Sequence, residues 1–212
     1  MADTKRLQDM TLAELWELFP IELSDYNAAW RVWADEEIES LSSLLSEFSP
    51  EINHIGSTAI SSIKAKPVVD ILVETGNTIP MEKLRNILES AGYICMAESY
   101  NRMSFNKGYT PYGYAERVFH IHIRRTGDND EIAFRDFLNT YPAIAKEYEV
   151  LKISLLPTLQ HREGCALRIG DTVDSETEHH GYVPRPETAV RGYRHTYRRQ
   201  HESHKTRHET PA

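Results

Sequence analysis

The stretch that decides the fold reads His54-Ile-Gly-Ser-Thr-Ala59, followed by Lys64-Ala-Lys-Pro-Val-Val-Asp-Ile-Leu-Val-Glu74. Its second part contains a nearly continuous apolar run, which is typical of a central strand that is buried on both faces. Asp70 interrupts this run, and a carboxylate inside such a strand is costly unless it is paired or bound to a metal. The sequence therefore singles out Asp70 as the residue around which a functional site is built.

The tripeptide Gly56-Ser-Thr58 directly follows a short predicted strand at 52–55. A tight turn of this composition offers backbone N–H groups and two hydroxyls to a phosphate. Lys64 and Lys66 lie on the return path and could neutralise that phosphate, while Asp70 could hold a divalent metal that bridges phosphate oxygens. The simpler alternative is that Asp70 ends a strand or caps a loop and that the glycine marks only a turn.

Hydrophobic periodicity predicts the elements around this stretch. Thr11-Leu-Ala-Glu14 has the spacing of a capping box and starts a short helix that ends before Pro20. A longer helix begins at Asp25 or Asn27 and runs to about residue 48, with its tryptophans in the core, or alternatively stacked on a ligand. The remaining expected elements are helices at 81–91, 130–141 and 142–156 and strands at 67–73, 93–97, 102–106 and 118–124. Strands clustered between helices predict an α/β protein of the α+β type, with a mixed sheet and helices packed mainly on one side.

The strand at 118–124 alternates between polar and apolar side chains, so His120, His122 and Arg124 share one face. Two imidazoles on one face can bind a metal together or act as acid and base. A guanidinium on the same face adds a donor fork that matches phosphate. The alternative is a solvent-facing polar strip on an antiparallel edge strand.

Two further segments contribute candidate ligands. Asn106-Lys-Gly-Tyr-Thr110 leads into the histidine strand, and Phe134-Arg-Asp-Phe137 places Arg135 on the polar side of an amphipathic helix, where an exposed ion pair or a helix cap is the simpler explanation. The predicted catalytic and metal-binding residues are Asp70, His120 and His122. The predicted phosphate- or nucleotide-binding residues are His54, Gly56, Ser57, Thr58, Lys66, Asn106, Lys107, Arg124 and Arg135.

The composition changes sharply at Pro157. All phenylalanines, methionines and tryptophans precede it, whereas most of the 10 histidines follow it. A segment poor in large apolar side chains cannot offset the entropy lost on ordering. We therefore expect an N-terminal helical extension over 1–24, the domain over 25–157 and a divergent, largely disordered tail over 158–212. A histidine-rich metal tract or a basic nucleic-acid arm is the alternative for the tail.

Charge and hydropathy narrow the function class. The 212 residues carry a net charge of −8, and the excess of acids lies before Pro157, which argues against broad nucleic-acid binding through phosphate neutralisation. No run approaches the roughly 20 apolar residues that span a bilayer, so no membrane partner is expected. The first residues lack the apolar core of a signal peptide, and two cysteines make no disulfide framework. These features predict a cytoplasmic protein.

The segments quoted above, taken in order over about residues 10–157, resemble the GrpB family. Further matching pieces are Leu12-Ala-Glu-Leu-Trp-Glu-Leu-Phe-Pro20, Val118-Phe-His-Ile-His122, Phe134-Arg-Asp-Phe-Leu138 and Glu147-Tyr-Glu-Val-Leu-Lys152. The resemblance implies a branch of the nucleotidyltransferase superfamily, whose members mostly have no assigned reaction. Some members resemble domains fused to dephospho-CoA kinase, which associates the family with nucleotide or coenzyme chemistry. The family would continue after Lys152 with another amphipathic helix, and the loss of that pattern suggests a shifted reading frame in the source gene.

The superfamily pattern that this resemblance implies is Gly-Ser followed, about a dozen residues later, by two acids two apart on one strand. Gly56-Ser57 and Asp70 match, but Leu72 stands at the second acid, and Glu74 lies two residues further along the strand. His120 or His122 takes the place of the third acid. Paired acids hold two Mg²⁺ ions for in-line phosphoryl transfer, so a standard two-ion mechanism lacks one of its ligands here.

These features lead to an expected function. We expect an enzyme that uses Mg²⁺ or Mn²⁺ to transfer a nucleotidyl or phosphoryl group to an unidentified small substrate, with a nucleotide or another phosphate-bearing small molecule as its ligand. The alternative is a non-catalytic nucleotide- or coenzyme-binding module of the same fold, which the missing acid at Leu72 favours. A third hypothesis is an interaction domain whose acidic surface meets a protein partner.

Overall fold

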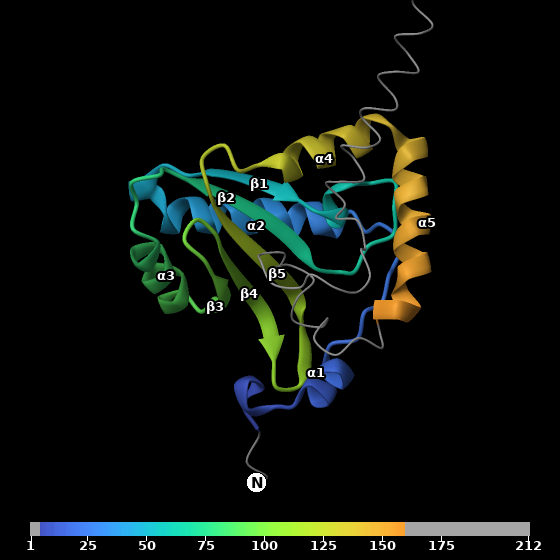
Figure 1. Cartoon of the computed structure of the whole chain (residues 1–212), viewed down its shortest axis with the longest axis horizontal. Helices are drawn as coiled ribbons and strands as arrows, with labels where there is room; N and C mark the ends of the chain where they lie inside the picture. Colours follow the sequence, from blue (N-terminus) through green and yellow to red (C-terminus); the bar gives the residue numbers. More distant parts are fainter. Residues whose placement is uncertain (1–4, 160–212) are drawn as a thin grey trace, which may run out of the picture. The chain divides into compact units, whose positions relative to one another are not determined.

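Five strands form one mixed sheet in the order β1-β2-β5-β4-β3 in the computed structural model, which describes residues 5–159 (Figure 1). Strands β2 and β5 run parallel, and the other three neighbouring pairs are antiparallel. The predicted α+β architecture, a mixed sheet with flanking helices, is confirmed. The strands are β1 (Glu51–Ile55), β2 (Val69–Thr75), β3 (Ile94–Glu98), β4 (Met103–Thr110) and β5 (Gly113–Arg125).

The helices precede, interrupt and follow the strands much as the periodicity predicts. The tail predicted from residue 158 onward lies outside the described residues except for the last two residues of α5, and the predicted domain boundaries stay predictions. The α-helices are α1 (Leu12–Leu18), α2 (Ala29–Leu44), α3 (Met81–Ser90), α4 (Asp130–Thr140) and α5 (Pro142–Leu159), and the 3-10 helices are η1 (Leu7–Asp9), η2 (Ser46–Phe48) and η3 (Ser57–Ala59).

The predicted capping box begins α1. The Thr11 hydroxyl accepts a hydrogen bond from the N–H of Glu14, whose carboxylate accepts one from the N–H of Thr11 in return. Phe19, directly after this helix, lies against Tyr109 and Tyr114 near the tip of the β4–β5 hairpin. The N-terminal helix is therefore fixed to the hairpin by aromatic contacts.

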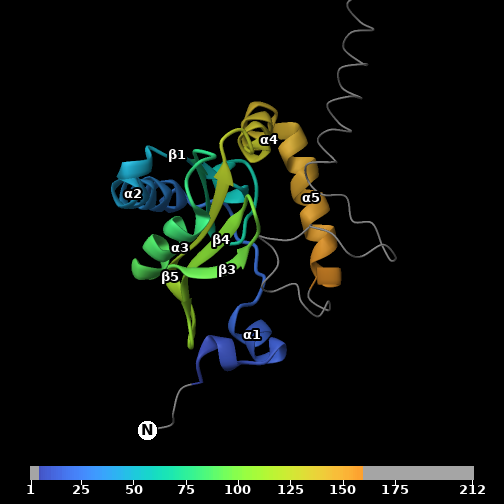
Figure 2. The same cartoon turned by 60° about the vertical axis from the view of Figure 1, so that its left-hand side comes forward.

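The main core lies between the sheet and the helices α2 and α3, which Figure 2 shows on the same side of the sheet. Trp30 of α2 is fully buried there, so the prediction that it is a core residue is confirmed. The inward side chains of β5 in this core are Phe119, Ile121 and Ile123, as the predicted alternation requires.

A second, smaller core joins α4 and α5 to the segment between β1 and β2. Ile60 and Ile63 of that segment pack against Leu138 of α4 and Ala145 of α5. This packing holds α5 beside the segment that contains the Gly56-Ser57 turn, and Figure 1 shows the helix running next to that segment. No helix within residues 5–159 is long and apolar enough to cross a membrane.

One alternative from the sequence is wrong. Strand β5 is the middle strand of the sheet, so its polar face is not a solvent-facing strip on an edge strand. His122 and Arg124 are 6% and 4% exposed. The predicted strand also starts too late, because β5 begins at Gly113 and forms a long hairpin with β4, whose pairing extends to Thr110.

Candidate functional site

The pairing of β2 with β5 places the three chemistry-bearing side chains together. Asp70 lies beside His120, and Leu72 lies beside His122, in a parallel register. Neighbours in register share a face of the sheet, so Asp70, His120 and His122 all project from the face opposite α2 and α3. We call these three residues the triad.

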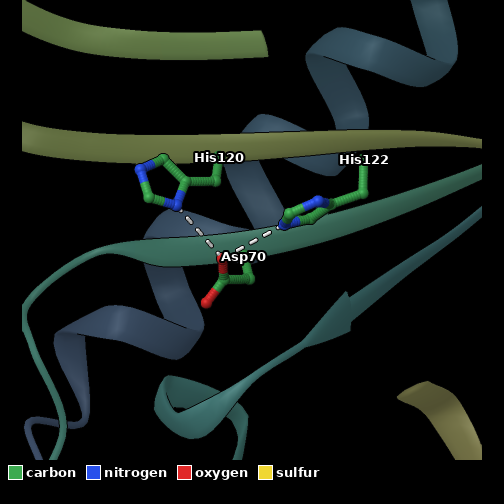
Figure 3. A group of neighbouring side chains, drawn as sticks. All are labelled: Asp70, His120 and His122. Carbon is green, nitrogen blue, oxygen red and sulfur yellow. Dashed lines mark hydrogen bonds and ion pairs between the residues drawn. The ribbon is translucent and has the colours of Figure 1, made fainter. Parts of the chain in front are cut away.

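Both imidazoles point at the same carboxylate oxygen (Figure 3). Oδ1 of Asp70 is 3.2 Å from Nε2 of His122 and 3.4 Å from Nδ1 of His120. Two ligands bound about 2.1 Å from one ion lie about 3.0–3.4 Å apart, depending on whether the geometry is octahedral or tetrahedral. One ligand atom from each of the three side chains falls within 4.8 Å of the others. The triad therefore has the donor set and the spacing of a metal site.

The electrostatics of the triad favour an ionised carboxylate. Burial raises the pKa of Asp70, but hydrogen bonds and charge interactions with His120 and His122 outweigh burial and leave this pKa below its usual value. The side chain of Asp70 is nevertheless 26% exposed, against 14% for His120 and 8% for His122. The carboxylate is thus charged and partly accessible, as a metal ligand must be.

Gly56 lies directly against this carboxylate. Its φ of +72° is a left-handed conformation that favours glycine, and a Cβ atom built on it would collide with Oδ2 of Asp70 and lie 2.9 Å from Cγ. The Gly-Ser turn and the acid are therefore in contact, and no side chain larger than that of glycine fits between them. Asp70 is paired with β1 on one side and with β5 on the other, so it neither ends a strand nor caps a loop.

The histidines differ in what holds their second ring nitrogen. Nε2 of His120 is 2.8 Å from the hydroxyl of Tyr109, whose ring stacks on the imidazole with centroids 5.9 Å apart. Nδ1 of His122 is buried and has no hydrogen-bond partner among residues 5–159. Tyr109 therefore orients the ring of His120, whereas no residue within 5–159 fixes the tautomer of His122.

A chain of tyrosine contacts continues from His120 to the N-terminal segment. Burial raises the pKa of Tyr109, and the charge of Tyr114 and a hydrogen bond with it raise this pKa further. The Tyr114 hydroxyl lies 3.5 Å from the carbonyl of Phe19. The donor across the contact between Tyr109 and Nε2 of His120 depends on the tautomer of the imidazole. In the tautomer in which Nε2–H donates to the tyrosine oxygen, Nδ1 directs a lone pair toward Asp70 and can bind a cation.

Helix α5 brings a lysine to the Gly-Ser turn. Nζ of Lys152 is 3.0 Å from Oγ of Ser57 and 2.8 Å from the carbonyl of Lys64, and it lies 5.1 Å from the ring centroid of Tyr148. Burial lowers the pKa of Lys152 to about 8, although the charges of Glu149 and Asp70 raise it. Burial raises the pKa of Tyr148, and the charge of Asp70 also raises it. Lys152 and Tyr148 therefore lie within electrostatic reach of the triad.

Three predicted ligands do not lie with the triad. His54 and Lys107 project from the opposite face of the sheet, and Thr58 forms a hydrogen bond with His54. His54 pairs with Ile71, on the face that α2 covers, and its Nε2 is 3.0 Å from the hydroxyl of the buried Thr58. Lys107 is held on that same face by both carboxylate oxygens of Glu37, each 2.8 Å away. These contacts hold His54, Thr58 and Lys107 away from the triad.

The other predicted ligands divide between the site and its surroundings. Asn106 pairs with His120 across β4 and β5 and shares the face of the triad. Lys66 lies 4.9 Å from the ring centroid of Tyr114. Arg124 donates to backbone carbonyls, 3.1 Å from that of Ile123. Arg135 bonds the carbonyl of His54 at 2.7 Å and also forms the exposed ion pair with Asp136 that the simpler explanation predicted.

The second acid of the expected pattern is absent from the triad. Leu72 is fully buried beside His122. Glu74 faces the same way but accepts hydrogen bonds from the N–H of Gly127 and the amide of Asn129, which hold the loop before α4. Glu74 therefore stabilises a loop, and among the described residues one carboxylate and two imidazoles make up the group that could hold a metal ion.

Sequence reasoning missed Tyr109, Tyr148 and Lys152. Tyr148 and Lys152 are four residues apart, which places them on one face of a helix, and Tyr148 packs against the second core. That spacing is visible in the sequence and marks Lys152 as a lysine on a buried face. Tyr109 gave no comparable signal, because its contact with His120 depends on an irregular pairing register in the β4–β5 hairpin.

The profile of the family described as "GrpB protein" matches residues 20–165. The UPF0157 protein YqkA of Bacillus subtilis (strain 168) is 33% identical over 165 residues, which are 73% of this chain and 46% of the relative, so the chain spans about half the length of YqkA. The glutamate-rich protein GrpB of Alkalihalophilus pseudofirmus is 34% identical over 63% of this chain and 79% of the relative. The crystal structure of the conserved protein GrpB from Enterococcus faecalis superposes with a TM-score of 0.56 and 29% identity, covering 70% of this chain and 91% of that one.

Proposed function

The chain belongs to the GrpB family, and from that premise we propose that it is an enzyme that transfers a nucleotidyl or phosphoryl group to a small substrate with the help of one divalent metal ion. The observation that carries this proposal is the contact of Asp70 with two imidazoles on one side and with Gly56 on the other. It joins a metal-binding donor set to a turn suited to phosphate.

The donor set bears on the choice of ion. Mg²⁺ prefers oxygen ligands, whereas imidazole nitrogen suits borderline transition ions, and two histidines with one carboxylate leave coordination positions open for water or substrate. We therefore extend the expected Mg²⁺ or Mn²⁺ to Zn²⁺ and related ions and expect the latter to bind more tightly. When bound, the ion would polarise a phosphoryl oxygen.

The chain's own residues would divide the remaining work. Asp70, His120 and His122 would hold the ion, and Tyr109 would keep the Nδ1 lone pair of His120 directed at it. The Gly-Ser turn would bring the phosphate close to the ion, because a glycine there lets the backbone approach Asp70. A second ion has no comparable ligand group among the described residues, since Leu72 is apolar and Glu74 is engaged by the loop before α4.

The test is turnover of nucleoside triphosphates by the full chain, measured as released phosphate or pyrophosphate in the presence of Mg²⁺, Mn²⁺ or Zn²⁺. Metal-dependent turnover that Asp70→Asn abolishes would support the proposal. Asp128→Asn is the matched control, because Asp128 forms an exposed pair with Arg102 outside the site. If calorimetry detects neither metal nor nucleotide binding, the proposal is rejected.

A non-catalytic nucleotide- or coenzyme-binding module is the second candidate. The buried Leu72 in place of an acid favours it, because a two-ion centre cannot form around one carboxylate. This candidate predicts ligand binding that persists in EDTA and yields no product in long incubations with any of the three ions.

A further inference from the structure

Lys152 is a cation whose contacts in the described chain are all uncharged. Its ammonium donates to the Ser57 hydroxyl and the Lys64 carbonyl and lies over the ring of Tyr148. Within residues 5–159 no carboxylate lies within ion-pair distance of it. Glu149, one turn away on α5, is engaged by Lys146 at 2.8 Å and by the N–H of Lys64.

A largely buried charge with only neutral partners is costly, and proteins compensate for it by shifting its pKa or by binding an opposite charge. Burial shifts the pKa of Lys152 to about 8, which still leaves it mostly protonated at neutral pH. The folded chain therefore keeps an ammonium beside the Gly-Ser turn, where the charges of Glu149 and Asp70 offset the cost of its burial only in part. A bound anion would remove this cost.

Ser57 and Tyr148, which both contact Lys152, carry hydroxyl groups that can donate to such an anion. Burial raises the pKa of Tyr148, and a hydrogen bond with Ser57 opposes this rise. Lys152 and Tyr148, four residues apart on α5, thus present an ammonium and a hydroxyl on the side of the helix that faces the turn.

We propose that Lys152, Ser57 and Tyr148 form an anion subsite that binds a phosphate group of the ligand beside the triad. This inference rests on the proposed function for the identity of the anion, and it adds α5 to a site otherwise built from the sheet and the Gly-Ser turn. Ser57 directly follows Gly56, which lies against Asp70, so the subsite is next to the carboxylate of the triad.

The test is calorimetric titration of inorganic pyrophosphate into the full chain in EDTA. We expect saturable binding that weakens at least tenfold in Lys152→Gln, because glutamine keeps an N–H donor for Ser57 but removes the charge. Lys146→Gln is the matched control: Lys146 lies on the same helix but pairs with Glu149 at the surface, and its loss should leave pyrophosphate affinity unchanged. Unchanged affinity in Lys152→Gln, or no pyrophosphate binding by the wild-type chain, would overturn the subsite.

Two further arms keep the result interpretable. If Lys152→Gln does not fold, Tyr148→Phe removes one hydroxyl only and is expected to weaken pyrophosphate binding several-fold; wild-type affinity in that variant overturns the proposal. Citrate, a carboxylate anion, is expected to bind at least tenfold more weakly than pyrophosphate, and equal binding overturns the assignment to phosphate. A separate titration of Mn²⁺ or Zn²⁺ without pyrophosphate reports on the triad, so loss of the metal site and loss of the anion subsite are distinguishable.

Discussion

The hydroxyl of Tyr109 lies 2.8 Å from Nε2 of His120, on the side of the imidazole that faces away from Asp70. Residues that hold the second nitrogen of a metal-binding histidine fix its tautomer and ring orientation. Here the support is extended through Tyr114 to the backbone at Phe19, so the N-terminal segment contributes to the orientation of a residue in the sheet. Tyr109 is thus a positioning residue for the proposed metal.

Tyr109→Phe removes the hydroxyl that contacts Nε2 of His120 while keeping the ring that stacks on the imidazole. We expect metal affinity to fall about 10–100-fold, because the wrong tautomer of His120 becomes accessible. Titration of Zn²⁺ or Mn²⁺ followed by calorimetry measures the change. Tyr100→Phe is the control, since Tyr100 is 91% exposed and should bind metal as the wild type does. Equal affinities in the two variants would show that the hydroxyl plays no part.

Gly56→Ala tests the contact between the turn and the acid. We expect a loss of about 3 kcal/mol or more in the free energy of unfolding, because a left-handed backbone is combined with a collision against Asp70. Gly127→Ala is the matched control: its φ is +90° but nothing lies within 4 Å of a new Cβ, so about 1–2 kcal/mol is expected. Urea unfolding of both variants measures the difference. Similar losses would mean that Asp70 can move aside at no cost.

The strands and their faces were predictable where one periodicity dominates. The alternation over 118–124 correctly places Phe119 and Ile121 in the core, and the apolar run around Asp70 correctly predicts a buried strand. The alternative of an edge strand failed because alternation reports which side chains share a face. Strand order depends on long-range pairing, which no local pattern contains.

The candidate site was predictable only in part for the same reason. Asp70 could be named from the cost of a carboxylate in an apolar strand, and His120 from its place on one face of a strand with His122. The parallel register brings Asp70 and His120 together. His54 and Lys107 were named for their residue type, but parity places them on the opposite face. Lys152 was missed because its meeting with Ser57, 95 residues earlier, is a tertiary contact made by the second core.

His54 predicts an acid-sensitive stability. Burial lowers its pKa from the ordinary 6.5 to about 4, with the nearby Arg135 contributing and Asp70 opposing. The unfolded chain therefore takes up a proton at His54 before the folded chain does, so stability falls as the pH drops from about 6.5 to about 4 and then levels off. The expected loss from this residue is about 3 kcal/mol.

Urea unfolding of the wild type and His54→Gln between pH 7 and pH 4 measures this contribution. Glutamine can keep a hydrogen bond to Thr58 but cannot take up a proton. The stability of the variant should depend less steeply on pH across this interval. Parallel curves for the two proteins would contradict the prediction.

Leu72 offers a test of the single-ion reading, because it occupies the position of the missing acid. Leu72→Asp should lower the free energy of unfolding in EDTA by about 3–5 kcal/mol, since a fully buried apolar side chain is replaced by a carboxylate beside the one at Asp70. If the new acid completes a metal centre with His122, a divalent ion at a concentration of about 100 times its Kd adds about 2.7 kcal/mol to the free energy of unfolding. The gain in thermal midpoint on adding Mn²⁺ should then exceed the gain in the wild type. Leu72→Asn has the same size without the charge and should show the wild-type gain, and if Leu72→Asp shows no more than this control, the position cannot be converted into a second metal ligand.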